Sequence, residues 1–147
     1  MTGISEFMTL YHRECDEMLA NAEELVSKSD WVKASELTMT FNDAMERHFG
    51  MEEEILFPAF EQRSGMVDGP TQVMREEHEQ MRRLLTQLQW ALEQQQQEDY
   101  LDTTETLLIM IQQHNMKEEG MLYPMSDEQL GVDAENIVEQ MQGYETK

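Results

Sequence analysis

Hydrophobic residues recur along the chain at alternating steps of three and four residues, in four separate stretches. These stretches cover residues 4–25, 34–55, 74–92 and 100–121. Such spacing puts the apolar side chains on one face of an α-helix. We find no useful run with the two-residue alternation of a strand, so the sequence predicts an all-α protein.

Turn-forming residues separate the four predicted helices. Residues 27–30 are polar, and Ser29 or Asp30 can cap the second helix. Pro58 disfavours helix at the preceding residue, so we expect the second helix to end between residues 57 and 62. Pro70 suits the first position of the third helix. A short connection near residues 98 and 99 should precede the fourth helix, which should end before Pro124.

Four amphipathic helices joined by short connections predict an antiparallel, up-down four-helix bundle. A length of 147 residues fits a single domain. We expect the bundle to occupy about residues 4–124. Residues 125–147 would then form a C-terminal extension, with a short helix at residues 133–142.

Histidine and glutamate stand at positions of the apolar stripes where core residues are expected. Two copies of a His-x-x-x-Glu pattern, His48 with Glu52 and His114 with Glu118, each lead into Leu, an aromatic residue and Pro. Residues four apart share a helix face, so each pair can offer a metal one imidazole and one carboxylate. His12 and His78 also lie on stripes. A shift of 66 residues superposes His12 on His78 and His48 on His114, which indicates a duplicated helical hairpin.

A metal site explains this pattern better than packing does. A lone histidine on an apolar face is usually a core residue, and a single His-x-x-x-Glu pair usually lies on the surface. Two ionised carboxylates on apolar stripes, however, would cost several kcal/mol each unless a cation is near. The predicted metal ligands are His12, His48, Glu52, His78, His114 and Glu118.

Two metal ions suit six such ligands better than one. Two histidines per metal, with Glu52 and Glu118 bridging, would leave coordination positions open for water or a small ligand. A nitrogen and oxygen donor set suits iron or manganese, and zinc is also compatible with it. Whether Asp16, Glu53 or Glu119 joins the metal shell is left open. Core packing is the expected role of Tyr11 and Tyr123, although both are close enough in sequence to reach a bound oxygen species.

Composition limits the partners and the compartment. The formal charge of −21 would repel nucleic acids and anionic membranes, so neither is expected as a partner. A single cysteine, Cys15, allows no intramolecular disulfide, and the N-terminus has no secretion signal. No apolar run is long enough to span a bilayer. These features favour a cytoplasmic protein, and nothing identifies a protein partner.

The motifs resemble the hemerythrin-like, or HHE cation-binding, domain family. The resemblance covers residues 12–124 and rests on His12, the two His-x-x-x-Glu patterns and residues 76–79, Glu-Glu-His-Glu. It implies a non-haem centre of two iron ions, oxo- or hydroxo-bridged, that binds dioxygen or, in some branches, nitric oxide or peroxide.

The third and fourth helices each depart from the ligand pattern of the oxygen-carrying hemerythrins. Met74 and Arg82 lie where a fifth histidine would complete a pair with His78, and Glu119 lies where an aspartate is found on the fourth helix. The four-histidine, two-glutamate set is more like the di-iron domain of iron–sulfur cluster repair proteins. We therefore expect a protein that binds a small diatomic molecule as carrier, store or sensor. The alternative is a di-iron oxidoreductase or repair-type protein that reacts with nitric oxide or peroxide or donates iron, so enzymatic activity is left open.

Overall fold

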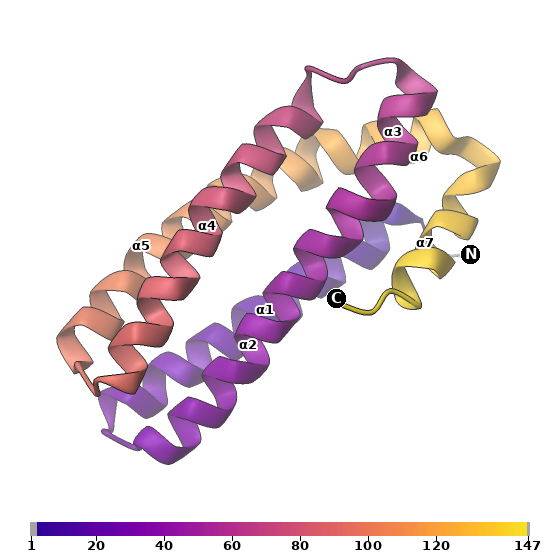
Figure 1. The fold of residues 1–147 in the computed structure, drawn as a ribbon. Coiled ribbons are helices and arrows are strands. Elements are labelled where there is room, and N and C mark those ends of the chain that lie inside the picture. The colour runs from indigo at the N-terminus through magenta and orange to yellow at the C-terminus, as the bar shows by residue number, and fades with distance from the viewer. Residues whose placement is uncertain (1–2, 147) are drawn as a thin grey trace.

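Four long helical runs form an antiparallel bundle in the computed structural model, which describes residues 3–146 (Figure 1). Helix α1 pairs with α2 and helix α4 pairs with α5, while α1 also packs on α5 and α2 on α4. No strand occurs within the described residues. The predicted all-α, four-helix architecture with a short C-terminal helix is therefore confirmed.

The helix bounds follow the turn residues. The elements are α1 (Ile4–Ser27), α2 (Trp31–Met51), η1 (Glu52–Leu56), α3 (Phe57–Ser64), α4 (Pro70–Glu93), α5 (Gln97–Lys117), η2 (Glu118–Leu122), α6 (Tyr123–Leu130), η3 (Gly131–Asp133) and α7 (Ala134–Gln142). The carboxylate of Asp30 caps α2 by accepting the Lys33 N–H at 3.3 Å, as predicted. The connection before α5 lies at residues 94–96 rather than at 98 and 99. Gln95 turns the chain there with a φ of 52°.

The core has two apolar parts, one toward each end of the bundle. One part contains Phe41, Leu85, Leu88 and Leu107. The other contains Ile4, Met51 and Leu122, together with residues of α3 and α7. Along each long helical run the predicted metal ligands lie where one part gives way to the other. The apolar halves of the core therefore enclose a buried polar layer.

Two π-helical turns interrupt the runs, and each begins at a predicted ligand. In η1 the Phe57 N–H bonds to the Glu52 carbonyl, and in η2 the Tyr123 N–H bonds to the Glu118 carbonyl. Each of these hydrogen bonds joins residues five apart instead of four, so the turn contains one extra residue. Such turns are often found at functional sites. The next residue in each run is a proline, which has no N–H to donate. Each widened turn therefore ends beside a residue that has no N–H for an α-helical hydrogen bond.

The predicted helix ends near the two prolines are therefore wrong. The second run continues through Pro58 to Ser64, and the fourth continues through Pro124 to Leu130. The widened turns also shift the apolar face by one residue. Met121, which the helical period placed in the core, is 45% exposed, whereas Leu122 and Tyr123 are fully buried.

The C-terminal segment folds back over the end of the bundle where the N-terminus lies (Figure 1). Asp127 of α6 accepts hydrogen bonds from the Ile4 and Ser5 N–H groups, at 2.8 and 3.0 Å, and so caps α1. Arg47 of α2 donates to the carbonyl oxygens of Met141, Gln142 and Tyr144. These contacts attach residues 127–144 to the bundle. Within the described residues, no helix is long and apolar enough to cross a membrane.

Candidate metal centre

The six predicted ligands meet at one level of the bundle, although they come from four different helical runs. They are between 0 and 4% exposed. Glu52 Oε1 lies 3.1 Å from His48 Nε2 and 3.0 Å from His78 Nε2. Glu118 Oε1 lies 3.2 Å from both His12 Nε2 and His114 Nε2. The metal-ligand role of these residues stays a prediction, but their side chains do converge.

Four of these side chains form a compact group suited to a metal ion. One ligand atom each from His48, Glu52, His114 and Glu118 lies within 4.8 Å of the others. Glu118 Oε2 is buried and has no hydrogen-bond partner within the described part of the chain, and His114 Nε2 makes no well-aligned hydrogen bond although Glu118 Oε1 lies 3.2 Å away. Buried polar atoms are normally paired, so these atoms point to a missing cation. A cation among them would satisfy both, and the donor set fits iron, manganese or zinc.

Carboxylates outside the cluster orient three of the histidines. The Nδ1 atoms of His12, His78 and His114 lie 2.7, 2.7 and 2.8 Å from carboxylate oxygens. A carboxylate accepts a hydrogen bond from Nδ1–H, so the lone pair lies on Nε2, the atom that faces the cluster. The three carboxylates belong, in that order, to Glu119, Glu53 and Glu77. Glu53 and Glu119 thus contact histidines of other helices.

The electrostatics of the cluster favour a bound cation. Burial and the neighbouring Glu118 carboxylate raise the pKa of Glu52, because two buried negative charges repel each other. Burial alone would lower the pKa of His114, but the Glu118 and Glu52 carboxylates raise it to about 9. Without a metal, protons must balance the charge of the two carboxylates. A metal ion would replace those protons.

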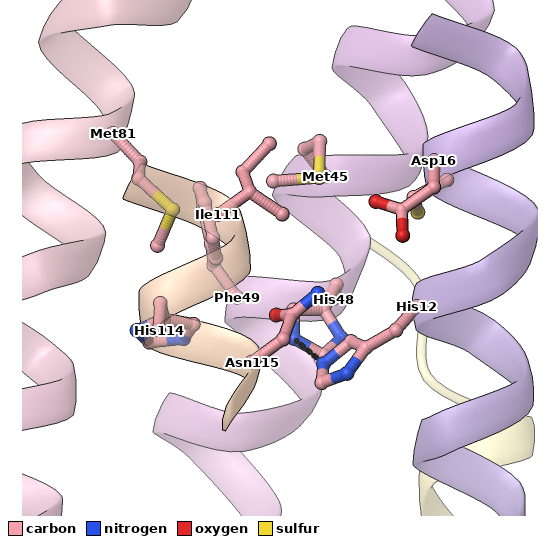
Figure 2. Close-up of a pocket in the computed structure, with 10 residues that line it drawn as sticks. His12, Asp16, Met45, His48, Phe49, Met81, Ile111, His114 and Asn115 are labelled. Atoms are coloured by element: carbon pink, nitrogen blue, oxygen red, sulfur yellow. Dashed lines mark hydrogen bonds between the residues drawn. The ribbon is translucent and has the colours of Figure 1, made fainter. Parts of the chain in front are cut away.

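A small apolar cavity adjoins the cluster. Figure 2 shows Met45, Met81 and Ile111 on one side of it and His12, His48 and His114 on the other. Its free volume is about 10 Å³, which is room for about one small molecule. Asp16, which the sequence left open as a ligand, lines this cavity, and burial raises the pKa of its carboxyl.

Tyr123 belongs to the centre, although the sequence predicted a packing role in the core for it. Its hydroxyl lies 2.8 Å from both Glu52 Oε2 and Glu118 Oε1. Tyr123 follows Glu118 by five residues, and an α-helix would direct two such residues to different faces. The proline at position 124, repeated at position 58, was the available signal for a widened turn. Glu77 was also missed, although it directly precedes His78.

Comparison with known proteins agrees with this geometry. The family model described as the hemerythrin HHE cation binding domain matches residues 3–126. No curated protein and no solved structure matches the chain. The match covers most of the chain, and the protein belongs to the hemerythrin HHE cation-binding domain family. Together with the His/Glu cluster, family membership suggests a metal-binding protein of the di-iron type.

Proposed function

We propose that this protein holds two iron ions between its six converging side chains and binds dioxygen or another small diatomic molecule. His12 and His48 would hold one iron, since their Nε2 atoms lie 3.2 Å apart. His78 and His114, whose rings are 5.0 Å apart, would hold the other. Glu52 and Glu118 would bridge the two ions.

The cavity beside the histidines supports this proposal most directly. Its space suits a diatomic molecule and is too small for an organic substrate. Met45, Phe49, Met81 and Ile111 give the cavity an apolar side opposite the histidines. When bound, iron would supply the coordination positions and the electrons that dioxygen requires. The chain itself holds the histidines in one orientation and excludes water.

Reversible oxygenation tests the proposal. Metal-free protein is loaded with ferrous iron under anaerobic conditions, and its visible absorption is recorded while air is admitted and then removed. A band that forms and then disappears supports a dioxygen carrier, store or sensor. A band that forms and persists contradicts reversible binding and favours the alternative, an oxidoreductase or repair-type protein. Failure to take up two irons per chain, or preferential uptake of zinc, contradicts the di-iron assignment.

The ligand set is tested by removing one member at a time. His48→Ala or Glu118→Ala should lose metal, because each removes a donor and leaves its partners facing an incomplete site. Metal content per folded chain is the measurement, with helicity as the check on folding. The control is Glu105→Ala, a change at an exposed position of α5. Full metal occupancy in either ligand variant would show that the predicted set is wrong.

A further inference from the structure

The hydroxyl of Tyr123 faces two carboxylate oxygens and an imidazole nitrogen at once. Its Oη lies 2.8 Å from Glu52 Oε2, 2.8 Å from Glu118 Oε1 and 3.0 Å from His12 Nε2. The side chain is fully buried. A phenol has one proton to donate, so it cannot satisfy two carboxylate oxygens and an imidazole nitrogen together. The remaining contacts bring lone pairs together in a buried site, which is unfavourable unless protons on these groups or a metal ion lie among them.

These distances match the spacing of neighbouring donors around one metal ion. Donors about 2.0 to 2.2 Å from a metal and at right angles to one another lie about 3 Å apart. The predicted ligands show this spacing: His12 Nε2 is 3.2 Å from His48 Nε2, and His48 Nε2 is 3.1 Å from Glu52 Oε1. Tyr123 Oη therefore takes the position of a further donor beside His12.

The duplication supplies an internal comparison. Shifting by 66 residues places Tyr123 on Phe57 and His12 on His78. The Phe57 ring stacks on His78 with centroids 5.7 Å apart, and the Tyr123 ring lies 5.5 Å from that of His12. In the first half, Phe57 therefore fills the equivalent position without a hydroxyl group. The hydroxyl in the second half is not needed for packing, and burying it is costly unless it has a partner.

We propose that Tyr123 Oη is an oxygen donor to the metal held by His12 and His48, which makes the two metal positions chemically unequal. The proposal rests on the di-iron function above. Coordination would replace the phenol O–H bond with a metal–oxygen bond, and the proton would leave to solvent as the metal enters. The metal at His78 and His114 receives no such donor, because Phe57 occupies the equivalent position. That metal therefore has one protein ligand fewer.

Resonance Raman spectroscopy of the oxidised, iron-loaded protein tests the inference. Ferric iron bound to a tyrosine oxygen gives a visible charge-transfer band and enhances the vibrations of the tyrosine ring. Protein grown on ring-deuterated tyrosine should shift these vibrations, a readout that needs no variant. Tyr123→Phe should abolish the band while the protein keeps two irons per chain. Tyr11→Phe is the matched control, since the Tyr11 ring stacks 5.6 Å from His48 but its hydroxyl donates to the Ala44 carbonyl.

The outcomes separate this inference from the proposed function. Two bound irons without tyrosine vibrations, or vibrations that survive in Tyr123→Phe, overturn the role of Tyr123 and leave the di-iron function standing. Loss of the band in Tyr11→Phe alone would assign the donor to the wrong tyrosine and also overturns it. If the unaltered protein binds no iron, both the role of Tyr123 and the di-iron function are refuted. Deuterium-sensitive vibrations that vanish only in Tyr123→Phe establish the inference.

Discussion

His48 differs from the other three histidines in how its ring is held. Its Nδ1 is buried and has no hydrogen-bond partner within residues 3–146, whereas His114 Nδ1 contacts Glu77. The residue that corresponds to Glu77 in the first half is Tyr11, whose ring stacks on His48 with an interplanar angle of 19°. Ring stacking thus replaces a carboxylate. Because a carboxylate increases the basicity of an imidazole ligand, His48 should be the weakest nitrogen donor of the four.

The carboxylate of Glu119 should strengthen metal binding through His12. Glu119→Gln keeps a hydrogen-bond acceptor near His12 Nδ1 but removes the negative charge, and we expect metal affinity to fall about 10-fold or more. Glu119 suits this test better than Glu53, which also pairs with Arg82 at 2.9 Å. Affinity is measured by competition with a chelator of known strength.

The control for this prediction is Glu105→Gln, the same chemical change at an exposed position of α5. It should leave the affinity unchanged. Equal affinities in the Glu119→Gln variant and the unaltered protein would mean that this carboxylate orients the ring without tuning it.

At the scale of single elements, the helical period predicted most positions correctly and failed at the π turns. Glu52 follows His48 by four residues and Glu118 follows His114 by four. The N–H of each glutamate still bonds to the carbonyl of its histidine, so the common face of each pair could be read from the sequence. Beyond each glutamate the register changes by one residue. The proline that follows each widened turn is the one local signal of that change, and a proline is read more readily as a helix end than as a widened turn. Tyr123 was therefore assigned a packing role that its contacts do not support.

Helix α2 contains a position where an added methyl group should disturb the C-terminal segment. A Cβ on Gly50 would overlap the hydroxyl of Tyr144, which donates a hydrogen bond to Glu54. Alanine is otherwise favoured over glycine inside a helix by up to about 1 kcal/mol. Gly50→Ala should therefore be neutral or destabilising in the unaltered protein. In a Tyr144→Ala background, the same change should raise the free energy of unfolding by about 0.5–1 kcal/mol.

Urea denaturation of the four proteins in this cycle measures the coupling between Gly50 and Tyr144. A stabilising effect of Gly50→Ala that is the same in both backgrounds would show that Tyr144 does not occupy the site in solution. Distant, independent changes are additive, so a difference above about 0.5 kcal/mol indicates direct contact.

At the scale of the whole molecule, repulsion between like charges dominates the surface. The chain has 31 acidic and 10 basic residues, so most carboxylates have no basic residue to pair with. Raising NaCl from ~0.01 to ~0.1 M shortens the screening length from about 30 to about 10 Å. Screening should weaken the repulsion more than it weakens the few ion pairs, and the thermal unfolding midpoint should rise. KCl at equal ionic strength should act alike, and a midpoint that falls with either salt would contradict this account.

The overall architecture was the part most accessible to sequence analysis. Apolar periodicity and the 66-residue offset of the histidines predicted four helices in two similar hairpins, because both signals depend on backbone geometry alone. Contacts between segments far apart in the chain produce no periodic pattern in the sequence. Asp127 caps α1 across more than 120 positions of the chain, and no such pattern connects the two.

The loop between the two hairpins has a consequence for how the protein can be assembled. Val67 and Asp68 are exposed, and the chain on either side of them carries two histidines and one glutamate of the centre. Cutting there would give two fragments, each with half of the ligands and neither with a complete site. A metal ion bound by ligands from both fragments would then favour their reassociation, and the protein could be split into two chains whose joining reports the metal.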